Sequence, residues 1–131
     1  MEEFMKYVRD TDKSVDEAVS DVEAAVQRHG FGVLHTYDFK ATLRSKGFDL
    51  PDECRVLEVC NPRQASEILR TDMSVNMALP CRISVYEDGG QTRIGMIRPT
   101  ALLKLVSESA GLASSAEEVE RTIVAIIDES V

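Results

Sequence analysis

Two cysteines come closest to a chemical site in this sequence. Cys60 stands in the segment Cys60-Asn61-Pro62, and Cys81 follows Pro80 at the start of a later apolar segment. Two thiols that face one space can bind a soft metal or cycle through a disulfide. The pair therefore supports the hypothesis of a thiol-dependent redox or metal-handling protein.

Strand periodicity argues against a shared site for the two thiols. Side chains alternate between the faces of a strand, so Cys60 shares a face with Glu58, and Cys81 shares a face with Ile83. If Leu57 and Ile83 both point to the core, the two thiols lie on opposite faces. A β-bulge at either strand end would reverse this expectation.

Each candidate residue also has a structural explanation. Free cysteine is often buried as a small hydrophobe, and Asn61-Pro62 is typical of a helix start, with asparagine as N-cap. Arg82 can bind a carboxylate ligand or pair with Glu58. The candidate ligand or thiol site comprises Cys60, Asn61, Cys81, Arg82 and Glu58.

The familiar catalytic signatures do not occur. The sequence has no nucleophile elbow, phosphate-binding loop or dinucleotide fingerprint. The two histidines, His29 and His35, lack the spacing of a metal site, and no carboxylate pair stands out as acid and base. We therefore assign no metal, no cofactor and no catalytic residue, and the sequence favours a non-enzymatic protein while leaving enzymatic activity open.

Composition favours one compact acidic domain. The 131 residues, treated as a single domain over 1–131, carry 44% hydrophobic residues and a formal net charge of −8. Such a charge disfavours nucleic acid and anionic membrane as partners. No apolar run reaches the length of a membrane span, and three cysteines without an apolar signal core indicate reduced thiols. We expect a cytoplasmic protein.

The first half of the chain predicts two strands and a helix with clear ends. Residues 4–9 form a strand in this interpretation. Ser14 and Glu17 fit a capping box at the start of an amphipathic helix that ends before Gly30. Residues 31–37 predict a second strand, partly covered on both faces.

The later segments follow the same logic. Asp38 caps a short helix, residues 55–60 form a strand, a helix starts at Pro62, and residues 71–79 are expected to be a loop. Strands over 81–87 and 91–97 pair as a hairpin through Asp88-Gly89-Gly90. Helices follow over 99–106 and near the C-terminus, the latter capped by Ser114 and Ser115. These elements predict an α+β fold in which helices lie mainly on one face of an antiparallel sheet.

Three segments taken together resemble a prokaryotic family known as domain of unknown function 302. They are Gly30-Phe31-Gly32-Val33, Leu57-Glu58-Val59-Cys60-Asn61-Pro62 and Leu79-Pro80-Cys81-Arg82-Ile83-Ser84-Val85-Tyr86, and the resemblance extends over about 14–99. It implies a β-α-β(4)-α order, TATA-binding-protein-like in outline, and a homodimer. It implies no catalytic role, and the nucleic-acid role of the namesake fold does not transfer to so acidic a chain.

The leading hypothesis is a non-enzymatic module that binds a small molecule or a partner on a concave sheet face and acts as a homodimer. The alternative is the thiol-dependent redox or metal-handling protein built on Cys60 and Cys81. The two hypotheses differ in whether these thiols meet and ionise.

Overall fold

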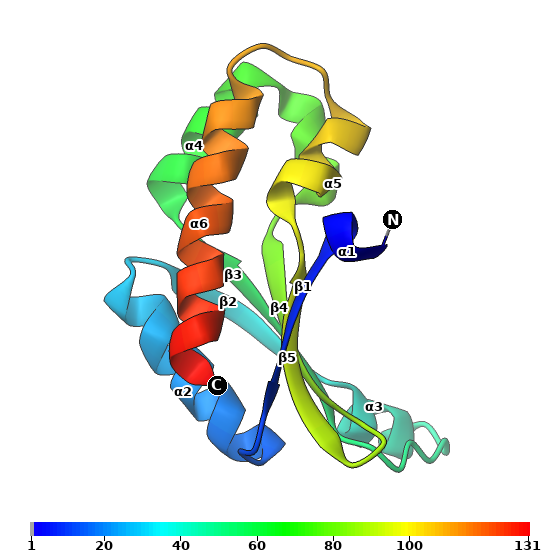
Figure 1. Ribbon diagram of the computed structural model, residues 1–131. Helices are drawn as coiled ribbons and strands as arrows, with labels where there is room; N and C mark the ends of the chain where they lie inside the picture. Colours follow the sequence, from blue (N-terminus) through cyan, green and yellow to red (C-terminus); the bar gives the residue numbers. More distant parts are fainter. Residues whose placement is uncertain (1) are drawn as a thin grey trace.

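Five strands form one antiparallel sheet in the order β1-β5-β4-β3-β2. The computed structural model describes residues 2–131, with side chains from residue 4 onward (Figure 1). The strands are β1 Lys6–Thr11, β2 Gly32–Asp38, β3 Cys54–Cys60, β4 Cys81–Asp88 and β5 Gln91–Ile97. The helices are α1 Glu2–Met5, α2 Val15–Arg28, α3 Phe39–Ser45, α4 Pro62–Thr71, the 3-10 helix η1 Met73–Ala78, α5 Pro99–Val106 and α6 Leu112–Ser130. The predicted α+β fold with an antiparallel sheet is confirmed.

Helices α2 and α6 cover one face of the sheet and enclose the core (Figure 1). Leu57 pairs with Ile83 across β3 and β4, and Val85 pairs with Ile94 across β4 and β5, so these side chains share the covered face. All four are completely buried, as is Ile126 of α6. Their removal from water is the main favourable term for folding.

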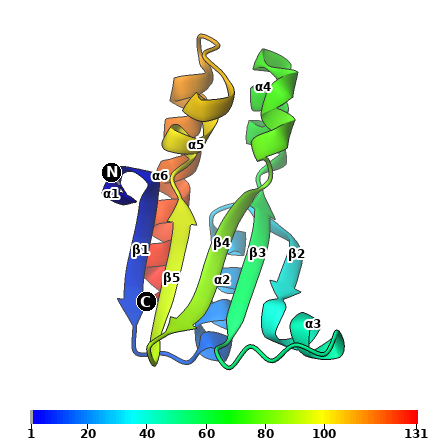
Figure 2. The same ribbon diagram turned by 90° about the vertical axis from the view of Figure 1, so that its right-hand side faces the viewer.

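The other face of the sheet is largely uncovered by helices (Figure 2). The strand register sets one row of side chains across this face, from Val8 through Gly95, Ser84 and Val56 to Tyr37. Helix α1 lies at one side of the face and α3 at the other, while α4 and α5 rise above the strands. Apolar and polar side chains of the sheet therefore remain accessible here.

The start of α2 confirms the predicted capping box. The Glu17 amide donates to Ser14 Oγ at 3.1 Å, and the Ser14 amide donates to Glu17 Oε1 at 3.3 Å. Gly30, with φ of 77°, follows the last turn and adopts the left-handed backbone that glycine accepts without strain. Local signals were sufficient here because both partners lie within one turn.

The predicted first strand is wrong at both ends. Residues 2–5 form the short helix α1, and β1 continues through Asp10 and Thr11 because these residues pair with Arg93 and Thr92 of β5. Their turn propensity is overridden by a ladder formed with a strand more than eighty positions away. Similarly, β2 is an edge strand whose side chains are mostly exposed, and not covered on both faces as predicted.

Two further boundaries differ from the sequence prediction. Residues 71–79 contain η1 in place of a loop, because Asp72 caps it by accepting from the Ser74 amide at 3.0 Å. Helix α6 begins at Leu112 after Gly111, so Ser114 and Ser115 lie inside the helix and do not cap it. Burial of Leu112 against the core extends the helix past the predicted start.

Asp72 also joins η1 to the segment that follows α5. Its Oδ2 accepts hydrogen bonds from the hydroxyls of Ser107 and Ser109. Together with Ser74 these donors lower the pKa of Asp72 to about 2, so the carboxylate is ionised at neutral pH and holds η1 and α5 together.

Gly95 provides a direct test of the packing of β1 on β5. A Cβ at this position would lie 2.9 Å from Val8 Cγ2 and 3.2 Å from the Tyr7 carbonyl oxygen. We expect Gly95→Ala to lower the free energy of unfolding by about 1–3 kcal/mol, as overpacking does elsewhere. Urea unfolding measures the change.

Gly32→Ala is the matched control, because nothing lies within 4 Å of a Cβ there. Its stability should be unchanged or raised by up to about 1 kcal/mol, since alanine restricts the unfolded chain. Equal stability of the two variants would contradict the packing shown for Gly95.

Candidate functional site

A cleft of about 540 Å³ opens on the uncovered face of the sheet, where β1, β5 and β4 run up to η1 and α5. Its floor consists of strand residues, and its upper walls come from η1 and α5. The main lining residues are Lys6, Val8, Val56, Arg82, Ser84, Tyr86, Ile97, Met77, Leu102 and Val106. The cleft is large enough for a small organic ligand.

Both charged side chains that line the cleft are cations. Lys6 comes from β1 and Arg82 from β4, and no carboxylate is among the described residues that line it. The chain as a whole carries a formal net charge of −8. The charged residues among the described lining of the cleft are therefore basic, although the chain as a whole is acidic.

Arg82 is only loosely paired. Its Nη2 lies 3.7 Å from Oε2 of Glu58, a distance longer than a hydrogen bond. The Arg82 side chain is 65% exposed, whereas Glu58 is 13% exposed. Hydrogen bonding to Glu58 also raises the pKa of Tyr37 on the neighbouring strand. Of the two roles considered for Arg82, the ion pair with Glu58 exists but leaves the guanidinium accessible at the cleft.

A second cavity, of about 300 Å³, lies behind the first, where α4, α5 and α6 meet the ends of β3 and β4. Its walls are almost entirely apolar and include Phe31, Leu34, Val59, Ala65, Ile68, Leu69 and Val119. Cys60 and Cys81 both line this cavity. No charged side chain is among its described lining residues.

The two thiols lie closer together than the alternation of strand side chains predicts. Leu57 and Ile83 pair on the covered face as expected. At the strand ends, however, Cys60 and Cys81 border one cavity. The alternation of side chains holds along the regular part of a strand, whereas Cys60 is the last residue of β3 and Cys81 is the first residue of β4.

The environment of the thiols keeps them protonated. Burial raises the pKa of Cys60, and burial together with the nearby Cys60 raises the pKa of Cys81 to about 11. Burial and Asp38 raise the pKa of Cys54. All three are free cysteines. Since the thiolate is the nucleophile and the metal ligand, none is activated at neutral pH.

The described residues contain no preformed set of metal ligands. Within the described part of the chain, no group of three or more histidine, cysteine, aspartate or glutamate side chains is placed to bind a metal ion. His29 instead pairs with Glu129 at 2.5 Å, and His35 stacks edge-on against Tyr37.

Asn61 has the structural role that its position predicts. Its Oδ1 accepts from the Gln64 amide at 3.0 Å and caps α4, while its Nδ2 donates to the Gly30 carbonyl at 3.2 Å. Both polar ends of the side chain are therefore used inside the fold. Of the five predicted site residues, Arg82 lines the cleft, Cys60 and Asn61 line the apolar cavity, and Cys81 lines both; Glu58 stands beside Arg82.

Sequence reasoning missed most of the cleft. Lys6 and Val8 lie on β1, which reaches the cleft because the sheet order places it beside β5, and Leu102 and Val106 come from α5. No sequence signal marked Ile97, an apolar residue whose side chain is 52% exposed in the fold. Exposure cannot be read from residue type alone.

These features define an α+β protein with helices on one face of an antiparallel sheet and a cationic, ligand-sized cleft on the other. The chain belongs to the family described as domain of unknown function DUF302, which it matches over residues 7–130. This match confirms the family resemblance and extends it toward both ends of the chain.

The crystal structure of an uncharacterized conserved DUF302 protein from Bacillus stearothermophilus has the same fold. It is 31% identical, has a TM-score of 0.92, and the alignment covers 97% of this chain and 98% of that one. No curated protein matches the chain. Within the described residues, no helix is long and apolar enough to cross a membrane.

Thiol titration tests the description of the cysteines. In the folded protein we expect alkylation of Cys81 by iodoacetamide to be slow at pH 7 and to accelerate as the pH approaches 11, because only the thiolate reacts. Site-resolved mass spectrometry measures the extent of modification at each cysteine.

Urea-unfolded protein is the reference, since its thiols should ionise near the ordinary pKa of about 8.5. The folded-state pKa is the higher of the two, so the difference in thiolate fraction between folded and unfolded protein should be widest midway between the two pKa values, at about pH 10. Rapid modification of native Cys81 at pH 7 would show that the thiol is activated after all.

Proposed function

We propose that the protein is a non-enzymatic module that binds a small amphipathic carboxylate in the sheet-face cleft and acts as a homodimer. The observation that carries the first part is the pairing of apolar walls with two cations, Lys6 and Arg82, in a chain of net charge −8. The family has no established function, so the proposal stands on this site.

The apolar walls favour a ligand with a hydrocarbon body. Val8 and Ile97 are exposed hydrophobic residues on adjacent strands, and Leu102 and Val106 face the same cleft from α5. Covering such surface contributes roughly 25 cal/mol for each Å² removed from water. A fully polar ligand would gain nothing from most of this lining.

Arg82 favours a carboxylate as the polar end. Its guanidinium presents several donors in a fixed plane that matches two carboxylate oxygens, and the contact to Glu58 at 3.7 Å does not occupy them with a close hydrogen bond. Hydrogen bonds to charged groups contribute about 1.5–3 kcal/mol each. Lys6 adds a second positive charge at the same cleft.

The lining supports binding more than catalysis. Ser84 and Tyr86 are the hydroxyl groups of the cleft, and no histidine, aspartate or glutamate is among its described lining residues. A serine nucleophile needs an adjacent base to activate it. The hydroxyls are therefore better suited to hydrogen-bond a ligand than to attack one.

Strand β2 supports the second part of the proposal, self-association. It is an edge strand, most of its side chains are exposed, and it carries no lysine or arginine. Leu34 on this edge is 62% exposed. The opposite edge, β1, carries Lys6, Arg9 and Asp10, and charged side chains are a common protection of sheet edges. We therefore place a second copy against β2, related by a twofold axis.

The thiol-dependent alternative has one observation in its favour, the shared cavity of Cys60 and Cys81. The raised pKa of both thiols opposes it, because redox and metal chemistry need thiolates. We also propose a cytoplasmic location, in which free thiols remain reduced.

Calorimetric titration with octanoate tests the binding site. We expect octanoate to bind, 1-octanol to bind more weakly, and Arg82→Gln to weaken octanoate by about tenfold or more, which corresponds to the loss of about 1.4 kcal/mol or more. Binding of 1-octanol should be nearly unchanged in this variant.

Arg44→Gln is the control, because Arg44 is an exposed arginine of α3 that does not line the cleft. It removes the same charge from the whole protein. If Arg82→Gln and Arg44→Gln bind octanoate equally well, or if octanoate does not bind the protein at millimolar concentration, the proposed carboxylate site is wrong.

Native mass spectrometry tests self-association. We expect a dimer that is lost or weakened in Leu34→Lys, because a lysine on β2 would place like charges together at the twofold contact. Leu105→Lys, at an exposed position of α5, should leave the dimer intact. A monomeric protein, or a dimer that both variants leave unchanged, would rule out the β2 interface.

A further inference from the structure

We propose that the ligand of the sheet-face cleft is a long-chain fatty acid carboxylate whose hydrocarbon end lies in the apolar cavity between α4 and α6. This inference rests on the proposed carboxylate site and adds the chain length of the ligand. It treats the two cavities as one binding site with a charged and an uncharged end.

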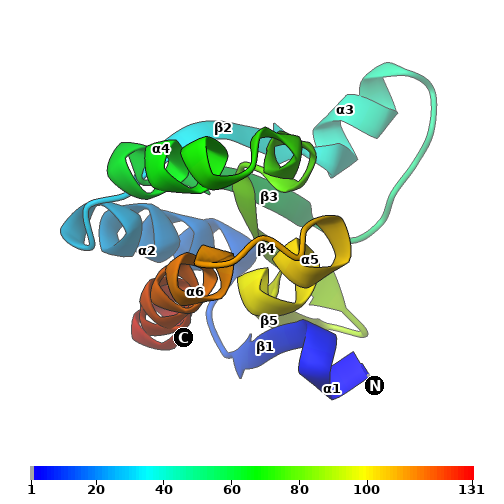
Figure 3. The same cartoon turned by 90° about the horizontal axis from the view of Figure 1, so that it is seen from above.

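The two cavities are neighbours in the structure. Both are lined by Leu79, Pro80, Cys81, Pro99 and Leu103. The separation between them is therefore formed by the start of β4 and by α5. Figure 3 shows from above that α4 lies opposite α5 and α6.

Helix α6 provides a second link between the cavities. Ile123 lines the cleft, and Val119 lines the apolar cavity. The two residues are four positions apart, so they are neighbours on one face of the helix. A single apolar stripe of α6 thus borders both ends of the proposed site.

The chemistry of the lining gives the site a direction. The cations Lys6 and Arg82 belong to the cleft, whereas the described lining of the second cavity contains no charged residue. Burying an ionised group without a partner is strongly unfavourable. A carboxylate therefore belongs in the cleft, and the second cavity suits hydrocarbon.

The polar residues of the second cavity are mostly occupied by the fold. Asn61 bonds to the Gln64 amide and the Gly30 carbonyl, and Asn76 Nδ2 donates to the Met73 carbonyl at 2.7 Å. Gln64 Nε2 donates to Glu118 Oε1 at 3.0 Å. Gln64 Oε1 is buried with no hydrogen-bond partner among the described residues, so this amide keeps one unused acceptor beside the apolar cavity.

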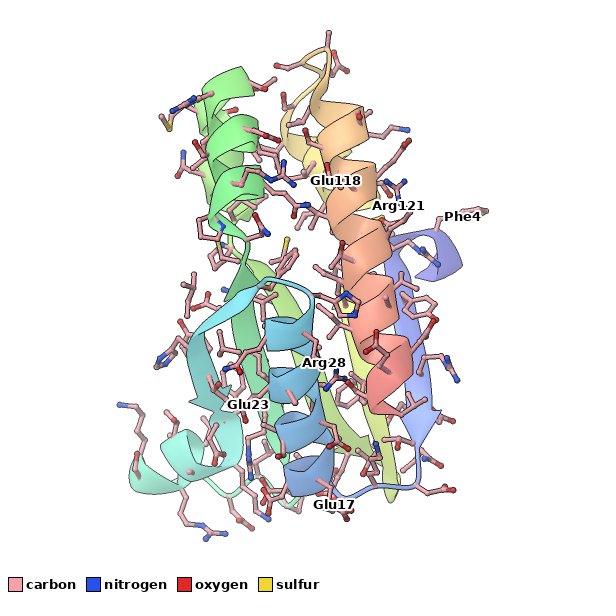
Figure 4. All side chains as sticks on the ribbon, turned by 90° about the vertical axis from the view of Figure 1, so that its left-hand side faces the viewer. Phe4, Glu17, Glu23, Arg28, Glu118 and Arg121 are labelled. Carbon is pink, nitrogen blue, oxygen red and sulfur yellow. The ribbon has the colours of Figure 1, made fainter. Side chains whose placement is uncertain are left out.

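A polar bridge joins α4 to α6 beside this cavity. Glu118, labelled in Figure 4, accepts from Arg63 Nη2 at 2.9 Å as well as from Gln64 Nε2 at 3.0 Å. The bridge links the two helices beside the apolar cavity, and its charged partners Arg63 and Glu118 are 58% and 43% exposed.

A chain-length series on wild type and one variant tests the inference. From octanoate to tetradecanoate, used below its aggregation concentration, affinity should rise by up to about fourfold for each added methylene. Ala65→Phe fills part of the apolar cavity and should weaken tetradecanoate at least tenfold while leaving octanoate within twofold. Ala41→Phe, at an exposed position of α3, should change neither.

Alkylation of Cys60 gives a readout that does not depend on how Ala65→Phe folds. Cys60 lines the apolar cavity but not the cleft. Saturating tetradecanoate should slow its modification at alkaline pH, whereas saturating octanoate should not.

The outcomes separate this inference from the proposed function. Octanoate binding that depends on Arg82, without a gain from longer chains or protection of Cys60, overturns the long-chain assignment alone. Absence of octanoate binding overturns the carboxylate site itself, and the long-chain assignment with it.

Discussion

The packing of α2 and α6 against one face of the sheet is the interaction on which the rest of the structure depends. It buries Leu57, Ile83 and Ile94 completely and fixes which face of each strand points inward. Since strand side chains alternate, the same packing fixes the outward set, including Val8 and Arg82. The cleft is a consequence of burying only one face of a five-stranded sheet.

Charge distinguishes the cleft from the remaining surface. A chain with a net charge of −8 repels anions at long range, yet Lys6 and Arg82 present positive charge inside an apolar concavity. Asp72 does not line the cleft but stabilises its upper walls. Its hydrogen bonds to Ser74 and Ser107 link η1 to α5. In the proposed function, local charge and local shape therefore select the ligand more than overall charge does.

Sequence patterns were reliable where the deciding partners are close in the chain. The capping box of Ser14 and Glu17, the Asn61 cap and the hairpin turn at Gly89 and Gly90 all formed as predicted. Two of the wrong boundaries arose where a residue distant in the chain determines the local structure. Asp10 resembles a turn residue but pairs with Arg93, and α6 starts before its predicted caps because Leu112 is buried.

The sequence by itself determined the α+β class, the antiparallel hairpin, the main amphipathic helix and the family, because each depends on short-range periodicity or on the order of short segments along the chain. It also singled out Arg82 beside Glu58. Only the tertiary structure decided that β1 lies next to β5, that Lys6 joins Arg82 at one cleft, and that Cys60 and Cys81 line one cavity. The physical reason is that sheet order and helix placement follow from burial of one common core, which no single segment specifies.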